Sequence, residues 1–434
     1  MRYIYEHMED FEGVVFPDFK QHSGNLILHG AGINGALCAF TLEKMGVEFL
    51  CFSDNDPSKQ NTEYIGHPVY SPAECSRRFP NAAILFEAYT LDKDSIEELN
   101  ALGYQTILFP IPLLLNMDCN AAAAFITRHL NREDESYSFR DEVDSFQVYE
   151  WIDEYMIRGV GYVTQKQMMS RSINLDLTDQ CTLRCKNCLA LKPYFTNRTE
   201  MPWEQTEQVI DHLLSLKWFR RFHVMGGEPF LCTYLDKALE MLCASPEVEH
   251  INILTNGTVI PSEAVLKQLE NPKIVIRVSY YGELSKNYRK LEDICFQRNI
   301  KVRVHAQRWK DIGRALETVS DEQQTKERYN RCCQPAGAFF YTLHGKVSIC
   351  PFAANTYALG MYESDGEDVV DLLNIDSPEA LFERLNALYW RKNPLTACYY
   401  CNGWLSYDTK PVPVAVQYEA GEQPVLPSYT EKKA

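Results

Sequence analysis

The sequence predicts an α/β protein with parallel sheets in two separate regions of the chain. Short apolar runs alternate with helical patterns near the N-terminus and again beyond residue 172, and this alternation is typical of parallel sheets. Turns rich in glycine or cysteine follow several of these runs, at the carboxyl ends of the predicted strands. Because α/β sheets bind their ligands at that edge, we expect the functional residues there.

The same patterns divide the chain into five segments. We predict a parallel-sheet domain at residues 1–130, a helical connector at 131–168, a second α/β core at 169–325, a small cysteine-containing module at 326–405 and a disordered tail at 406–434. The tail is predicted from its prolines and mixed polar residues, a composition that buries too little apolar surface to fold alone.

The first domain contains a glycine-rich turn between a strand and a helix. Strands are predicted at 26–28, 47–52, 83–86 and 106–109, and a helix at 36–44. Gly30, Gly32 and Gly35 form the pattern G-x-G-x-x-G, and Asp54 follows about 20 residues later. Such glycines let a pyrophosphate approach a helix N-terminus, and the acid can bind a ribose. We predict a nucleotide or nucleotide-sugar site, with an empty scaffold as the alternative. The domain resembles small Rossmann-like domains attached to enzymes of nucleotide-sugar and surface-polysaccharide metabolism.

A cysteine triplet follows the first predicted strand of the second core. Cys181, Cys185 and Cys188 have the spacing C-x3-C-x2-C, directly after the alternating apolar run 173–178. Three such thiolates can hold three corners of a [4Fe–4S] cluster and leave one iron open for reaction. Zinc would require a fourth ligand nearby, and no Cys occurs between Cys188 and Cys232 and no His before His212. An odd count of 15 cysteines argues against a disulfide framework.

Beyond the triplet, strands and helices alternate in the order expected for a parallel sheet. A helix is predicted at 203–216 and strands at 222–225, 251–254, 274–279 and 302–305. The turn Gly226-Gly227-Glu228-Pro229 follows the first of these strands, and Thr255-Asn256-Gly257 follows the second. In combination with the triplet, these motifs resemble the radical S-adenosylmethionine (radical SAM) superfamily over roughly residues 170–310. Asn187 stands where the family usually has an aromatic or apolar residue that packs on adenine.

The resemblance implies a partial (β/α)6 barrel and a chemistry. In the family, the methionine amino and carboxylate groups of S-adenosylmethionine chelate the open iron. An electron from the cluster then cleaves the cofactor to a 5′-deoxyadenosyl radical, which abstracts a substrate hydrogen. The resemblance also implies cofactor-binding residues: Gly226, Gly227, Glu228, Asn256 and Ser279. We expect the Glu228 carboxylate to bind the ammonium of the cofactor and Ser279 to bind a ribose. A turn-forming role is the alternative for Ser279.

A second cysteine group lies near the C-terminus. Its candidate ligands are Cys332, Cys333, Cys350, Cys398 and Cys401, with Gly345 in a predicted hairpin. This arrangement resembles the auxiliary-cluster extension of many radical SAM enzymes. The longer form of that extension, SPASM, needs seven cysteines, so the shorter twitch form matches better. We predict a second, fully ligated [4Fe–4S] cluster that carries electrons, with a four-cysteine zinc site as the alternative.

Composition excludes several classes of partner. A net charge of −16 argues against nucleic acid, because phosphates require clusters of Lys and Arg. We find no apolar run of the about 20 residues that a membrane helix needs and no basic export signal. We therefore expect a cytoplasmic protein that is reduced by a flavodoxin- or ferredoxin-type partner.

The predicted function is dehydrogenation of a small molecule. One radical cluster and one electron-carrying cluster suit a two-electron oxidation, and the N-terminal domain favours a sugar, a polyol or a nucleotide-linked polysaccharide precursor. His305 and Arg308, on and after the last predicted strand, are the candidate catalytic residues, although a lone strand His is often structural. Peptide maturation and sugar epimerisation are the enzymatic alternatives. A non-catalytic iron–sulfur scaffold or a sensor of S-adenosylmethionine or nucleotide is the remaining one.

Overall fold

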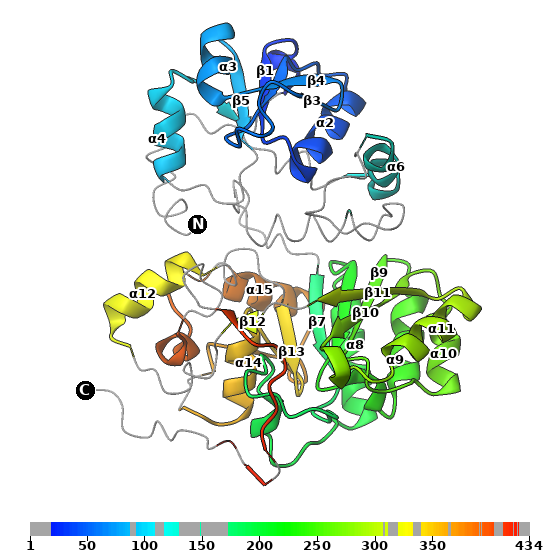
Figure 1. Cartoon of the computed structure of the whole chain (residues 1–434). Coiled ribbons are helices and arrows are strands. Elements are labelled where there is room, and N and C mark those ends of the chain that lie inside the picture. The colour runs from blue at the N-terminus through cyan, green and yellow to red at the C-terminus, as the bar shows by residue number, and fades with distance from the viewer. Residues whose placement is uncertain are drawn as a thin grey trace. The chain divides into compact units, whose positions relative to one another are not determined.

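The computed structural model divides into two compact units, Met1–Tyr162 and Val163–Ala434, each with its own sheet (Figure 1). The described residues are 19–86, 93–108, 117–129, 148, 172–306, 309–310, 320–332, 340–362, 366–389, 391, 393–402, 411–419, 421–422 and 424. The boundary between the units falls within the predicted connector 131–168, of which only Val148 is described.

The first unit is built on a parallel sheet with one antiparallel edge strand. Its order is β3-β4-β2-β1-β5-β6, with β1 (Leu26–His29), β2 (Cys51–Ser53), β3 (Glu63–Tyr64), β4 (His67–Tyr70), β5 (Ala83–Phe86) and β6 (Ile107–Leu108). Strand β1 lies between β2 and β5, so the chain reverses its direction of growth there. The predicted strand 47–52 is shorter than expected, because only its last two residues belong to β2.

Helices α2 (Ile33–Met45), α3 (Pro72–Arg78), α4 (Lys93–Ala101) and α6 (Cys119–His129) accompany this sheet. Helix α2 begins after the glycine-rich turn and ends at Gly46, whose φ of 70° closes the helix in the left-handed region. Helix α3 begins at the Ser71 cap, where the side chain accepts a hydrogen bond from the Glu74 N–H.

The second unit contains an eight-stranded sheet of order β11-β10-β9-β8-β7-β13-β14-β15. Five parallel strands come in chain order, namely β7 (Ser172–Asp176), β8 (Arg221–Met225), β9 (His250–Thr255), β10 (Ile274–Tyr280) and β11 (Lys301–Ala306). Helices α8 (Trp203–Ser215), α9 (Leu235–Ala244), α10 (Glu263–Leu269) and α11 (Tyr288–Arg298) alternate with them and lie beside the sheet (Figure 1). The alternation predicted from sequence is confirmed.

Apolar periodicity explains this packing. Helix α8 buries Thr206, Val209, Ile210 and Leu213, a single stripe at helical spacing. Strands β8 and β9 bury their apolar side chains on both faces, as parallel strands covered by helices do.

The C-terminal module shares the sheet of the core instead of standing apart. Strand β13 (Phe340–Leu343) pairs in parallel with β7, and β14 (Lys346–Ser348) and β15 (Val370–Asp371) continue antiparallel. Helices α12 (Glu322–Arg331), α14 (Pro351–Ala358) and α15 (Pro378–Tyr389) and the 3₁₀ turn η7 (Thr396–Tyr400) complete the module. The α/β class is thus established with parallel-dominated sheets, whereas the (β/α)6 barrel stays a prediction.

The expectation of a disordered tail at 406–434 is wrong for the described residues 411–419. Strand β16 (Pro411–Val412) pairs antiparallel with β12 (Trp309–Lys310), and Gln417 forms a bridge with Cys185. Residues 411–419 are ordered because backbone groups of the cysteine loop and of β12 pair with them, which the composition of the tail does not reveal. Among the described residues, we find no helix with the length and apolar character that a bilayer crossing requires.

Candidate iron–sulfur site

The three clustered cysteines occupy the loop that leaves the carboxyl end of β7. Backbone N–H groups point at their sulfurs: Leu183 N donates to the Cys181 Sγ over 3.4 Å, and the N–H groups of Ala190 and Lys192 approach Cys188. Donors of this kind stabilise thiolates rather than thiols. These donors partly offset the effect of burial, which favours the neutral thiols.

The thiols lie close enough to influence one another electrostatically. Burial raises the pKa of Cys181 to about 11, and the charge of Cys188 adds to the shift. Burial likewise raises the pKa of Cys185 to about 12, with contributions from Cys188 and Cys181. Three mutually repelling thiolates need a cationic centre, which suits a cluster. In the described part of the chain, no three His, Cys, Asp or Glu side chains gather around a single metal ion.

The two glycines after β8 hold the stem of the cysteine loop. A Cβ on Gly226, whose φ is 151°, would lie 2.5 Å from the Thr178 carbonyl oxygen, and one on Gly227 would lie 2.1 Å from the Gln180 carbonyl oxygen. The Gly227 N–H donates to the Thr178 carbonyl over 2.7 Å, and the Glu228 N–H donates to the Gln180 carbonyl over 2.7 Å. Only glycine permits this backbone contact.

Glu228 is held by hydrogen bonds inside the protein. Its side chain is fully buried; one oxygen accepts from the Thr255 hydroxyl over 2.8 Å and from the Phe230 N–H, and the other accepts from the Asn256 N–H over 2.9 Å. Burial raises the pKa of this carboxyl to about 7. The carboxylate fixes the turn after β9, and its contact with a cofactor ammonium stays a prediction.

That turn brings Asn256 to the first cysteine. The Asn256 Nδ2 group donates to the Cys181 Sγ over 3.6 Å and to the Thr182 hydroxyl over 3.3 Å. Asn256 was predicted to bind the cofactor, and its amide now also links the turn to the cluster loop.

Ser279 and His305 lie side by side on β10 and β11. The Ser279 side chain hydrogen-bonds to Tyr281, whose own pKa is raised by burial and by the three clustered cysteines. Burial lowers the pKa of His305 to about 4, and Arg277 and Arg303 lower it further. Arg308 lies outside the described residues.

Sequence reasoning missed a buried ionic network beneath the cysteine loop. The Lys192 ammonium lies 2.8 Å from Asp176 and 2.6 Å from Asp179, with all three side chains at most 1% exposed. Tyr341 on β13 donates to Asp176 over 2.6 Å, and His344, just after β13, lies 2.8 Å from Asp179. The partners are about 165 residues apart in sequence, so no local pattern signals the network.

Charge within this network is distributed unequally. Burial raises the pKa of Asp176, which Lys192 only partly offsets. Burial acts in the same direction on Asp179, but hydrogen bonds and charges from His344 and Lys192 bring its pKa below the usual value. The network ties the β13 hairpin to the loop that carries Cys188.

Comparison with known proteins adds an independent finding. Residues 175–321 match the model of the Radical SAM superfamily, over the strands and turns just described. This stretch of the chain is therefore similar to a radical SAM domain. This match supports the resemblance drawn from the motifs.

Curated relatives match over shorter stretches. The GTP 3′,8-cyclase of Acidothermus cellulolyticus is 27% identical over 95 residues, which is 21% of this chain and 26% of that protein. The L-lysine 2,3-aminomutase of Clostridium subterminale is 27% identical over 106 residues, 24% of each chain. The matched region therefore spans about a quarter of either relative.

Solved structures are similar over more of the chain. The structure of BtrN with AdoMet and 2-DOIA covers 58% of this chain and 98% of its own, with 20% identity and a TM-score of 0.36. The structure of Streptococcus suis SuiB covers 65% of this chain and 83% of its own, with 12% identity and a TM-score of 0.32.

In the C-terminal module, Cys350 and Cys401 of the second cysteine group lie within electrostatic range of Cys398. Cys350 caps α14, and Cys398 and Cys401 lie in or directly after η7. Burial raises the pKa of Cys398, and Cys401 and Cys350 raise it further. Cys332 ends α12, a helix that contacts η7. Cys333 lies outside the described residues.

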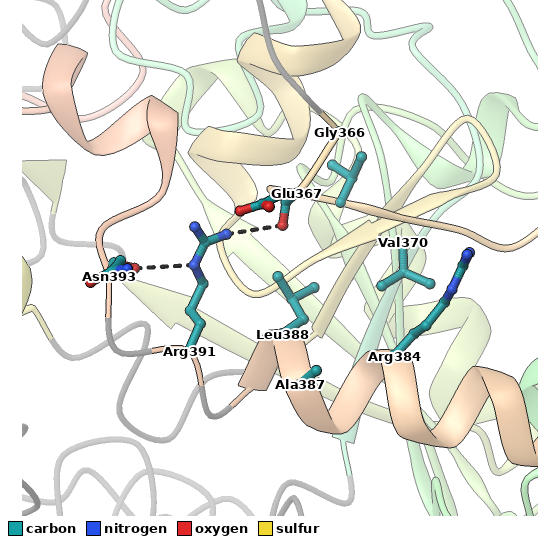
Figure 2. A pocket seen from close by; sticks show the side chains of 9 residues that line it. Gly366, Glu367, Val370, Arg384, Ala387, Leu388, Arg391 and Asn393 are labelled. Carbon is teal, nitrogen blue, oxygen red and sulfur yellow. Dashed lines mark hydrogen bonds between the residues drawn. The ribbon is translucent and has the colours of Figure 1, made fainter.

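A buried acid positions this second group. Asp368 accepts hydrogen bonds from the N–H groups of Thr396 and Ala397, over 3.0 and 3.2 Å, where η7 begins. Arg391 pairs with Asp368 over 3.3 Å and donates to the Glu367 and Asn393 carbonyls. Figure 2 shows Arg391 and Arg384 in the wall of a pocket of about 600 Å³ beside this support.

In the first unit, the Asp54 carboxylate already binds a backbone N–H of the glycine-rich turn. One Asp54 oxygen accepts from the Ala31 N–H over 2.8 Å and lies 3.2 Å from the Lys59 ammonium; the other accepts from the Asp56 N–H. Gly35 packs on Gly30, where a Cβ would meet the Gly30 carbonyl oxygen. Gly32 faces open space before α2. Asp54 therefore braces the turn as the structure stands.

Proposed function

We propose that this protein is a radical SAM oxidoreductase that dehydrogenates a sugar, a polyol or a nucleotide-linked precursor of a surface polysaccharide. The proposal rests on the presence of two sets of cysteines in the second unit. The first set is Cys181, Cys185 and Cys188, and the second is Cys350, Cys398 and Cys401; each has its own supporting polar contacts. A single radical reaction needs only the first group, whereas a two-electron oxidation also needs an electron acceptor.

When bound, a [4Fe–4S] cluster and S-adenosylmethionine would supply the radical chemistry that removes a hydrogen atom from substrate. The chain's own residues would hold them. The three thiols would ligate the cluster, and Gly226 and Gly227 would let the backbone approach the cofactor closely. Asn256 would orient Cys181 through its amide.

His305 is the proposed base for a substrate hydroxyl. Its pKa of about 4 keeps the imidazole neutral near pH 7, so Nε2 can carry a free lone pair, although the ring is a weaker base than an ordinary histidine. In the structure its Nε2 atom is buried without a hydrogen-bond partner. Arg308 stays a prediction as a second substrate contact.

The second thiol group is the proposed electron acceptor. Removal of one hydrogen atom from an alcohol leaves one electron and one proton to be removed before a carbonyl forms. Four thiolates would saturate a cluster and leave it no site for substrate, so it would pass the electron on. Cys332 or Cys333 would be the fourth ligand, and a flavodoxin- or ferredoxin-type protein would return electrons to the first group.

The test is an anaerobic assay of the reconstituted full chain with S-adenosylmethionine and dithionite. We expect roughly eight irons per chain, formation of 5′-deoxyadenosine, and a product lighter than its sugar or polyol substrate by two hydrogens. Replacing Cys181, Cys185 and Cys188 with Ala should abolish cofactor cleavage. Replacing Cys398 and Cys401 should preserve cleavage and abolish oxidation.

Each alternative gives a different result in this assay. A peptide maturase would turn over peptides and not sugars. An epimerase would return a product of unchanged mass in ordinary water, and in heavy water this product would carry one deuterium. An iron–sulfur scaffold or a sensor would form no 5′-deoxyadenosine with any substrate. Zinc instead of iron at the second group would refute the electron-acceptor role.

Nucleotide binding by the first unit is a separate proposal. The open space beside Gly32 at the N-terminus of α2 supports it, whereas a pyrophosphate would have to displace Asp54 from the Ala31 N–H. Calorimetric titration of the native chain with a nucleoside diphosphate sugar tests this proposal. If no heat of binding is measured, the glycine-rich turn has only a structural role.

A further inference from the structure

The C-terminal strap, defined here as the described residues 411–419 and 421–422, runs antiparallel along the cysteine loop. The Lys186 N–H donates to the Val416 carbonyl over 2.7 Å, and the Tyr418 N–H donates to the Arg184 carbonyl over 2.8 Å. Between these two bonds, Gln417 forms an antiparallel bridge with Cys185. The strap therefore pairs with the backbone on both sides of the middle cysteine.

The side chain of Gln417 faces the sulfur of that cysteine. Its Nε2 group donates to the Cys185 Sγ over 3.1 Å and to the Ala415 carbonyl over 2.6 Å. Its oxygen accepts from the Arg184 N–H over 2.7 Å. Because the oxygen faces a backbone donor and the nitrogen faces a backbone acceptor, the network fixes the amide with its N–H groups toward the sulfur.

Contacts at both ends hold the strap in this register. Strand β16 pairs with β12 at one end. At the other end the Lys186 ammonium lies 3.2 Å from the Glu422 carboxylate and 5.4 Å from the centre of the Tyr418 ring, and the Tyr418 hydroxyl meets that of Tyr194 over 3.4 Å. The backbone pairing and side-chain contacts of the strap therefore fix the position of the Gln417 amide.

A donor on a ligating sulfur changes the energy of adding an electron. The reduced form of a cluster carries one more negative charge than the oxidised form, so an N–H group directed at the sulfur stabilises the reduced form more. Hydrogen bonds to sulfur are among the factors that set cluster reduction potentials.

We propose that the strap is part of the cluster site and that Gln417 is a positioning residue which raises the reduction potential of the cluster held by Cys181, Cys185 and Cys188. The inference rests on the proposed function, because it requires a cluster at the triplet. It adds to that function a residue about 230 positions away in sequence that tunes how readily the cluster accepts an electron.

The test is a redox titration of the full chain followed by electron paramagnetic resonance. Cys398→Ala and Cys401→Ala are present in every sample, so that only the first cluster contributes to the spectrum. Gln417→Met removes the donor at similar length, and Gln417→Glu keeps an acceptor for Arg184 but places a carboxylate toward the sulfur. Gln208→Met is the matched control, because it makes the same change at an exposed residue of α8 whose amide donates to the Leu373 carbonyl.

We expect Gln417→Met to lower the ratio of reduced to oxidised cluster at a fixed potential by threefold to tenfold, a shift of about 28 to 59 mV for a one-electron couple. Gln417→Glu should shift this ratio further in the same direction, and Gln208→Met should leave it unchanged. Iron content and circular dichroism report whether each variant is folded and loaded.

Three results would overturn the inference. Equal potentials in all loaded variants would exclude tuning by the amide. Loss of the cluster from Gln417→Met with unchanged circular dichroism would make the amide a requirement for cluster retention instead. A parent chain with no cluster at the triplet would refute the proposed function itself, and the inference with it.

Discussion

At the scale of single residues, the region that matches the radical SAM model depends on two glycines, which have no side chain, as much as on its cysteines. Gly226 and Gly227 lie against the carbonyl groups of Thr178 and Gln180, so the turn after β8 and the cysteine loop share one tightly packed backbone layer. The sequence motif predicted the glycines. The physical reason for them, contact with backbone rather than only with a ligand, required the structure.

The first prediction concerns Gly227→Ala. The new Cβ would lie 2.1 Å from the Gln180 carbonyl oxygen, so the stem before Cys181 must move, at a cost of about 1–3 kcal/mol. We expect the free energy of unfolding to fall by that amount and the iron at the triplet to be lost. Gly32→Ala is the control, because no atom lies within 4 Å of the added Cβ. Full iron loading of Gly227→Ala would contradict this account of the turn.

A second residue-scale prediction concerns His29 in the first unit. Burial lowers its pKa from 6.5 to about 4, so the unfolded chain binds the proton more tightly. Stability is therefore complete above about pH 6.5 and falls as the pH drops toward 4. Between pH 7.5 and 5 we expect a loss of about 2 kcal/mol, measured by hydrogen exchange of the β1 amides. His29→Gln should remove this part of the pH dependence; an unchanged pH dependence would show that another group is responsible.

At the scale of elements, the C-terminal module is attached to the radical SAM core by buried charge as well as by strand pairing. Lys192 follows the cysteine loop, whereas Tyr341 and His344 belong to β13 and the turn after it. Burial of an ion pair is costly unless further hydrogen bonds complete it, and here Tyr341 and His344 supply those bonds. The hairpin and the loop should therefore respond together to mutation.

Lys192→Met tests this coupling. The change leaves Asp176 and Asp179 buried without their counter-charge, which costs about 3–5 kcal/mol. Lys346→Met is matched to it, because the pair of Lys346 with Asp371 is about one-third exposed and should contribute at most about 1 kcal/mol. Denaturant unfolding measures both. Similar losses for the two variants would show that burial of the Lys192 network carries no special weight.

Asp368→Asn tests the support of the second thiol group. An Asn at this position loses one acceptor oxygen and the charge that pairs with Arg391, so the start of η7 should loosen around Cys398. We expect about half of the iron to be lost while formation of 5′-deoxyadenosine continues. Arg384→Ala, on the exposed part of the same pocket, should retain all of the iron. Retention of both clusters by Asp368→Asn would show that the cysteines hold the site without it.

Element positions illustrate what sequence can and cannot predict. The strands from β7 to β11 and the helix α8 were predicted to within about two residues, because their apolar periodicity is local. The role of Glu228, the joining of β13 to β7 and the pairing of the strap with the cysteine loop were not. Each depends on partners between 27 and about 230 residues away, and periodicity carries no information over that range.

At the scale of the whole molecule, two units serve different tasks in the proposed function. The second unit carries both thiol groups and the candidate base His305, so all of the proposed redox chemistry belongs to it. The first unit carries the glycine-rich turn and a strand order that reverses at β1, the position at which doubly wound sheets bind ligands. In the proposed function, a nucleotide-linked substrate would involve the glycine-rich turn of the first unit as well as the redox residues of the second.

The central claim is that the triplet holds a cluster with one iron open to S-adenosylmethionine. Electron paramagnetic resonance of the reduced Cys398→Ala/Cys401→Ala chain, recorded with and without S-adenosylmethionine, tests it most directly. We predict a signal of a single [4Fe–4S] cluster whose g values change when S-adenosylmethionine is added. A spectrum that stays the same, or a triplet loaded with zinc and silent in this experiment, would contradict the account.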